Sequence, residues 1–113
     1  MINLMAVLIV CLAACSALPE HNQRLAEGKK IAFDRSKGNC LACHQIEDGS
    51  EPGNIGPPLR ALQLRFSEKP QLREQIVDAT RFNPETSMPP FGKNAILNDE
   101  EIDKIVDYLW TLP

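Results

Sequence analysis

The sequence contains few aromatic side chains and very little histidine. Its 113 residues include four phenylalanines, one tyrosine, one tryptophan and two histidines. A domain of this size with so few large side chains buries a modest core and is only marginally stable by itself. A large apolar group bound at its centre would change that balance.

Basic runs are also absent. Lysine and arginine number 12 against 15 aspartates and glutamates, and the formal net charge is −3. No basic stripe suggests nucleic acid as a partner. The acidic excess gathers near the C-terminal end, where a single Lys104 accompanies five acidic residues: Asp99, Glu100, Glu101, Asp103 and Asp107.

No apolar run approaches the length of a membrane span. Residues 4–14 have the length of a signal-peptide h-region, well short of the roughly 20 residues needed to cross a bilayer. The L-A-A-C sequence that ends at Cys15 resembles a bacterial lipoprotein processing site, with Cys15 as the lipidated residue; ordinary cleavage near Ala17 is the alternative. We therefore expect an exported, periplasmic protein with a signal peptide over 1–14, a short tether over 15–24 and one domain over 25–113.

Only two cysteines remain for the mature domain, because Cys11 lies in the signal peptide and Cys15 is acylated or removed. They stand in the stretch G-N-C-L-A-C-H as Cys40 and Cys43, directly before His44. A disulfide between residues three apart closes so short a loop that it adds little stability. Three chemical uses remain: half of a zinc site, a dithiol redox switch, or covalent attachment of haem.

Helical spacing without strand alternation predicts an all-α fold of three to five helices. We expect helices over 25–35 and 59–66, and one over 67–79 with Ser67 as its N-cap.

The last helix has the clearest signals. Asn98 and Glu101 form a capping-box pair, and Leu97 with Ile102 forms a hydrophobic staple. Its apolar stripe predicts core packing and comprises Ile102, Ile105, Val106, Leu109 and Trp110.

Haem attachment agrees best with the rest of the chain. Cys40, Cys43 and His44 share one face of a helical turn, and C-x-x-C-H is the attachment signature of c-type haem. Structural zinc needs four ligands, and the only other histidine, His21, lies in the expected tether. A redox dithiol would follow a strand. We predict one covalently bound haem c, with thioethers from Cys40 and Cys43 and with His44 on the iron.

The sixth iron ligand is predicted to be Met88, the one methionine after the signal peptide. It lies in the Pro-rich stretch 83–92, and its soft thioether suits haem iron. The plainer interpretation is a gap-filling core residue. The stretch G-P-P-L at 56–59 either supplies a backbone carbonyl to His44 or is simply a turn.

The order of these motifs resembles class I cytochromes c. It runs from an N-terminal helix through C-x-x-C-H, G-P-P-L and M-P-P-F-G to a C-terminal amphipathic helix. The resemblance implies that the carbonyl of Pro57 bonds to His44, that Met88 is the distal ligand and that the first and last helices cross. It leaves open whether Ala32 or Phe33 meets Trp110.

A narrower resemblance is to the SoxX family, the monohaem subunits of SoxAX sulfur-oxidation cytochromes. It rests on G-N-C-L-A-C-H, G-N-I-G-P-P-L and S-M-P-P-F-G. It implies a periplasmic heterodimer with a SoxA-like subunit that carries the catalytic haem. That complex, an L-cysteine S-thiosulfotransferase, joins thiosulfate to a cysteine of a sulfur-carrier protein. This chain would pass the electrons to another cytochrome and hold no catalytic residue.

Two other functions stay open at this stage. One is a freestanding or lipid-anchored shuttle cytochrome of a respiratory chain. The other is an open-site haem enzyme or gas sensor, which requires that Met88 does not bind iron.

Overall fold

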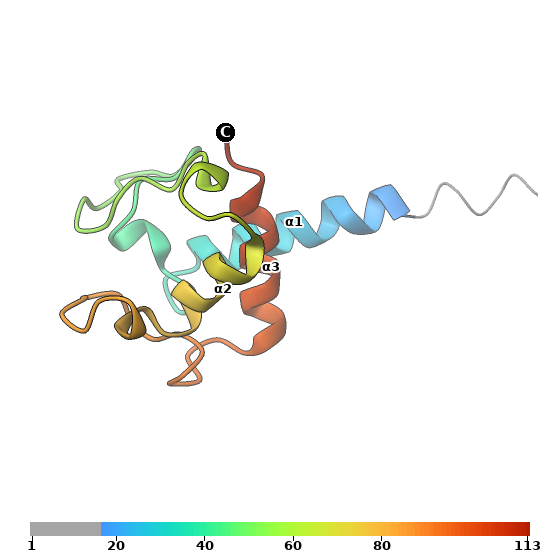
Figure 1. The fold of residues 1–113 in the computed structure, drawn as a ribbon. Coiled ribbons are helices and arrows are strands. Elements are labelled where there is room, and N and C mark those ends of the chain that lie inside the picture. The colour runs from blue at the N-terminus through green and yellow to red at the C-terminus, as the bar shows by residue number, and fades with distance from the viewer. Residues whose placement is uncertain (1–16) are drawn as a thin grey trace, which may run out of the picture.

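Three α-helices and three short 3-10 turns make up the fold of residues 17–113, the part of the chain described by this computed structural model (Figure 1). The α-helices are α1 (Ala17–Phe33), α2 (Lys69–Val77) and α3 (Asp99–Trp110). The 3-10 turns are η1 (Cys40–Ala42), η2 (Leu62–Leu64) and η3 (Ala79–Arg81). Extended pairing within these residues is limited to one isolated bridge between Ile46 and Leu59. The all-α prediction is confirmed.

The expected signal peptide and the lipidation candidate Cys15 lie outside the described residues. Within residues 17–113, none of the helices combines the length and the apolar character that crossing a membrane requires.

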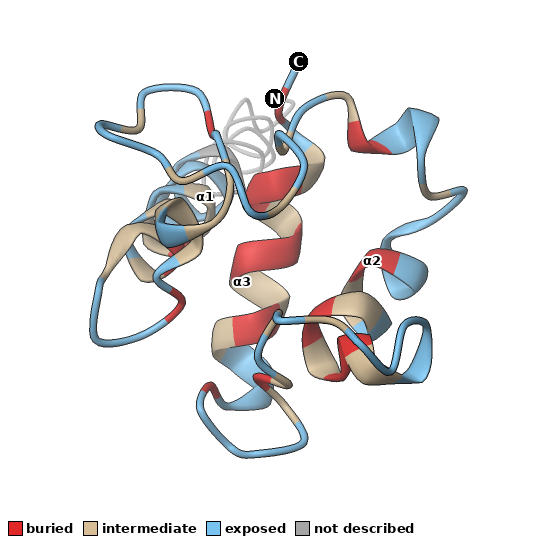
Figure 2. Ribbon diagram, turned by 90° about the vertical axis from the view of Figure 1, so that its left-hand side faces the viewer, coloured by how far each residue is buried: buried red, intermediate tan, exposed pale blue. Residues whose placement is uncertain are grey.

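Helix α3 is the centre of the domain, and both α1 and α2 pack against it (Figure 2). Its N-terminus carries the predicted capping box, in which the Asn98 side chain accepts from the Glu101 amide and the Glu101 carboxylate accepts from the Asn98 amide. The staple residues Leu97 and Ile102 are both buried. The predicted stripe is buried except for Trp110, which is half-buried.

Helix α1 begins eight residues earlier than the sequence predicted, at Ala17 instead of Leu25. The described part of the expected tether is therefore helical. Its residues 19–23 are exposed, and this end of α1 projects from the body of the domain (Figure 1). Arg24 is the first residue to hold it to α3, through Asp107 at 2.6 Å and Glu100 at 2.7 Å.

The backbones of α1 and α3 touch at Gly28. A Cβ atom at this position would lie 2.1 Å from the carbonyl oxygen of Lys104, so only glycine allows the approach. One turn further, the rings of Phe33 and Tyr108 meet edge to face with centroids 6.3 Å apart. The aromatic pair between the two helices is thus Phe33 with Tyr108, and Trp110 takes no part in it.

The acidic residues of α3 are paired with cations from elsewhere in the chain. Arg73 of α2 bonds to Asp103 at 2.6 Å and to Asp99 at 3.0 Å. The Asp107 carboxylate accepts hydrogen bonds from both Arg24 and Lys69. Burial alone would raise the pKa of Asp107, but these two hydrogen bonds outweigh it and hold the pKa below its usual value.

Helix α2 begins later than predicted. Its N-cap is Glu68, with Pro70 in the first turn, whereas Ser67 donates from its amide and hydroxyl to the Gln71 side chain. Leu72 and Ile76 form its buried face as expected. The expected helix over 59–66 is reduced to the 3-10 turn η2, and Ala79 is buried just beyond α2 in η3.

We predict that Gly28→Ala destabilises the domain by about 1–3 kcal/mol, because the added methyl overpacks the contact with α3. Helix propensity alone predicts the opposite sign, a gain of up to about 1 kcal/mol. Denaturant unfolding of the purified protein measures the difference. The matched control is Ala26→Gly, an exposed site on the same helix, which should cost about 1 kcal/mol. A more stable Gly28→Ala variant would contradict the close contact.

Candidate cofactor site

The turn that carries Cys40, Cys43 and His44 follows directly after α1. The chain leaves the helix through backbone hydrogen bonds from Lys37 and Asn39 to the Asp34 carbonyl. Asn39 then adopts a left-handed conformation at φ 49°, which asparagine tolerates better than most residues. The reversal at Asn39 starts η1 at Cys40, seven residues after the end of α1 at Phe33.

The two thiols and the imidazole share one helical turn, as the spacing predicted. The amide of Cys43 donates to the Cys40 carbonyl at 3.2 Å, and the amide of His44 donates to the same oxygen at 2.9 Å. The turn is 3-10 where it starts and closes with an α-type bond. Both cysteines are free thiols, and both are partly exposed.

The ring of His44 is held in one orientation. Its Nδ1 lies 2.6 Å from the carbonyl oxygen of Pro57, so Nδ1 acts as the donor and Nε2 keeps its lone pair. The ring also lies against Gly56, where a Cβ would come within 2.3 Å of Cε1. The loop that contains Gly56 and Pro57 folds back on the turn that contains Cys43 and His44. There the Gly56 amide donates to the Cys43 carbonyl.

Met88 lies on a second irregular loop, between η3 and α3. Its amide donates to the Thr86 hydroxyl at 3.1 Å, and its sulfur accepts from the side-chain amide of Gln75 at 4.0 Å. The loop is joined to α2 at its far end, where the amides of Gly92 and Lys93 both donate to the Val77 carbonyl.

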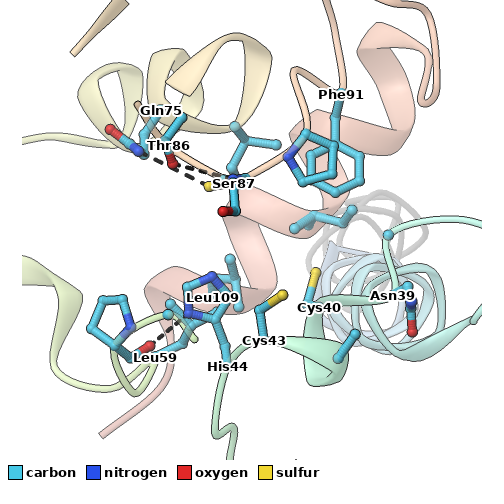
Figure 3. Close-up of a pocket in the computed structure, with 18 of the residues that line it drawn as sticks. Asn39, Cys40, Cys43, His44, Leu59, Gln75, Thr86, Ser87, Phe91 and Leu109 are labelled. Atoms are coloured by element: carbon cyan, nitrogen blue, oxygen red, sulfur yellow. Dashed lines mark hydrogen bonds between the residues drawn. The ribbon is translucent and has the colours of Figure 1, made fainter. Parts of the chain in front are cut away.

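One cavity of about 630 Å³ is lined by Cys40, Cys43, His44, Pro57 and Met88. Figure 3 shows Cys40, Cys43 and His44 on one side, with Gln75, Thr86 and Ser87 opposite. The walls between these two sides are mostly aliphatic and include Leu59, Leu62, Leu72, Ile76, Ile105 and Leu109. Every site residue predicted from the sequence thus lines this cavity, apart from the lipidation candidate Cys15, which lies outside the described residues.

The Cys40 thiol is poorly suited to redox exchange. Burial raises the pKa of the Cys40 thiol to about 11, whereas a dithiol oxidoreductase needs a thiolate near neutral pH. The cavity is also unlike a zinc site, since residues 17–113 hold no group of three histidine, cysteine or acidic side chains placed to share a metal ion. The arrangement instead suits a large apolar ligand that bonds to two thiols.

Sequence reasoning missed two contacts of the site. Gln75 was not singled out, although its position one residue before the buried Ile76 places it beside the core face of α2. The contact between Gly56 and the His44 ring was also missed. A glycine that precedes two prolines was the one available signal.

Comparisons with known proteins found a family and individual relatives. A family model for cytochrome c matches residues 25–113. A curated relative from Aquifex aeolicus (strain VF5), named as an uncharacterized lipoprotein, is 37% identical over 94 residues, which cover 82% of this chain and 45% of the relative. The chain therefore spans less than half of that relative's length.

Among solved structures, the crystal structure of SoxXA from P. pantotrophus matches with a TM-score of 0.68 and 32% sequence identity. The match covers 76% of this chain and 79% of that chain.

The chain belongs to the cytochrome c family. Residues 25–113 are therefore a cytochrome c domain, and the family implies a covalently attached haem c as cofactor.

Gly56→Ala should displace the His44 ring and break its bond to Pro57, because the new methyl would lie 2.3 Å from the ring. We expect a loss of about 1–3 kcal/mol in unfolding free energy and broadened low-spin absorption bands in the reduced holoprotein. Asn54→Ala, an exposed site on the same loop, should change neither. Unchanged bands in Gly56→Ala would show that the ring does not depend on this contact.

Proposed function

We propose that the chain is the electron-transfer subunit of a SoxAX-type complex, with one haem held by this cavity. Cys40 and Cys43 would form the two thioether bonds, His44 and Met88 would bind the iron, and the Pro57 carbonyl would orient His44. When bound, the haem supplies a one-electron iron couple. The observation that carries the proposal is the convergence of two free thiols, a fixed imidazole and a thioether on one apolar cavity.

The residues present fit a haem in size and chemistry. A cavity of about 630 Å³ lies within the roughly 300–1,000 Å³ that cofactor pockets occupy. The aliphatic walls of the cavity would exclude water from the haem ring. The hydrogen bond of His44 Nδ1 to Pro57 leaves the imidazole Nε2 free to bind metal. Met88, as a second protein ligand, would leave the iron no open site, which supports electron transfer over an open-site enzyme or gas sensor.

A SoxA-like partner is supported by two observations. The chain shares 32% sequence identity with SoxXA from P. pantotrophus. Its cavity is also lined by two apolar side chains that are exposed at the surface, Ile55 at 73% and Ile96 at 44%. In this proposal, both side chains belong to the surface that would meet the partner subunit. The complex would couple thiosulfate to a cysteine of a sulfur-carrier protein, while this subunit passes the electrons to another cytochrome.

A second candidate function is a lipid-anchored shuttle cytochrome, which is favoured by the relative named as a lipoprotein. Both functions place the domain in the periplasm, and both are compatible with a lipid on Cys15. They differ in whether the domain works in a stable complex with a catalytic subunit.

Met88→Ala tests the axial ligand. The oxidised wild-type protein should show the weak near-infrared band of sulfur-to-iron ligation, and the variant should lose it. The variant should also have a lower reduction potential and bind carbon monoxide or cyanide, because the axial ligand is a main determinant of haem potential. Ser87→Ala, the exposed neighbour on the same loop, should keep the band. A Met88→Ala variant that kept it would require a ligand from elsewhere, such as His21 or a partner chain.

Reconstitution tests the complex. The purified chain alone should not be reduced by thiosulfate, whereas the chain together with a SoxA-like subunit and the sulfur-carrier protein should be.

A charged residue at Ile55, on the exposed apolar edge of the cavity, should weaken this complex. Ile55→Asp should weaken binding of the SoxA-like subunit at least tenfold, which corresponds to about 1.4 kcal/mol. Leu64→Asp is the matched control, because Leu64 is 88% exposed and lies outside the cavity. Equal effects of the two variants would contradict docking at this edge of the cavity. In the reconstitution experiment, reduction of the isolated chain by thiosulfate would contradict the SoxAX role.

A further inference from the structure

The first two turns of α1, residues 17–24, project from the body of the domain (Figure 1). Arg24 marks the point where the helix meets the body, since its guanidinium binds Glu100 at 2.7 Å and Asp107 at 2.6 Å on α3. One turn later the backbones of α1 and α3 touch at Gly28. The helix is therefore fixed to the domain from Arg24 onward, and the part before it extends outward.

The projecting turns have local reasons to be helical. Pro19 lies in the first turn, where its missing N–H would have no partner within the helix. Glu20, also in the first turn, suits the positive end of the helix dipole. Gln23 donates to Glu27 one turn further on, at 3.1 Å. Because these turns continue a helix that is already fixed, they need no nucleation of their own, and they extend it as a stiff rod.

The surface of the projecting end suits water and not lipid. Its described side chains are all exposed, and they are Pro19, Glu20, His21, Asn22 and Gln23. A helix that lies in a membrane surface needs a large apolar face and basic residues on the opposite face. Residues 19–23 have neither, so this part of the helix should stand in water.

The lipidation candidate is very close to the start of this helix. Only Ser16 stands between Cys15 and Ala17, and two peptide units span at most about 7 Å. From Ala17 to Arg24 the helix then rises about 10 Å, and over its whole length about 24 Å. The turn with Cys40, and with it the cavity, follows the opposite end of α1.

We propose that residues 17–24 are a stiff, water-exposed spacer that holds the body of the domain about 10 Å above a lipid bilayer, with the cavity facing away from the bilayer. The inference rests on a lipid at Cys15, with which the proposed function is compatible. A flexible tether would let the domain reach redox partners within the membrane. The spacer instead presents the cavity to partners in the periplasm.

The test uses the full-length, lipid-modified holoprotein on a supported bilayer of phosphatidylethanolamine and phosphatidylglycerol. Neutron reflectometry measures the protein density along the bilayer normal. The wild type should show a layer of low density, about 10 Å thick, between the headgroups and the body of the domain. Polarised absorption on the same bilayer should show a preferred orientation of the haem.

Two insertions of equal length after Gln23 test the stiffness. The insert E-A-A-A-K-A-A continues the helix, so it should thicken the low-density layer by about 10 Å and keep the haem orientation. The insert G-G-S-G-G-S-G is flexible, so it should abolish both the distinct layer and the preferred orientation. Gln23 lies outside the cavity, so the haem absorption spectrum serves as the folding control and should match wild type in both variants.

The outcomes separate this inference from the proposed function. A wild-type protein that does not partition into the bilayer has no lipid anchor, and the inference is then wrong while the electron-transfer role stands. An anchored wild type without the low-density layer, or one whose cavity edge at Ile55 meets the headgroups, would also overturn it. Equal density profiles for the two insertions would show that residues 17–24 are not stiff.

Discussion

The packing of α1 and α2 on a single helix, α3, determines the geometry of the site. The turn with Cys40 and His44 continues from α1, while the loop with Met88 is joined to the end of α2 through the Val77 carbonyl. Since both helices rest on α3, the distance between the two walls of the cavity depends on two helix contacts. The contact at Gly28 has no room for even a methyl group, so the wall that carries His44 cannot move without opening the core.

Charge pairing fixes the register of these contacts. The sequence shows an acidic C-terminal helix with one lysine, which would be expected to repel itself. In the fold, Arg24 of α1 and Lys69 of α2 both reach Asp107. Arg73 of α2 reaches Asp103 and Asp99. Each such pair is worth little where solvent screens it. Together they favour one rotation of α1 and α2 about α3, and in that rotation Gln75 of α2 lines the cavity.

Local signals predicted the parts of the structure that depend on local interactions. The capping box of Asn98 and the stripe of α3 are encoded within 13 consecutive residues, so they were recognised. The start of α1 was not recognised, because residues 17–24 have no apolar stripe. They are held at Arg24 by Glu100 and Asp107, which lie 76 and 83 positions further along the chain. C-x-x-C-H and the sole mature methionine identified candidate ligands without the fold. Gln75 could not be found in that way, since its contact with Met88 depends on how α2 meets a loop 13 residues later.

The size of the cavity explains why so small a core suffices. The roughly 630 Å³ between the two loops is space that the apolar side chains of the domain do not fill by themselves. A domain of this size is only marginally stable, so a group that fills this space would stabilise it. The aliphatic side chains of α2 and α3 that face the cavity would form a core together with the proposed haem. Such a core would account for the scarcity of aromatic residues, and the proposed attachment at Cys40 and Cys43 would tie it to the fold of the chain.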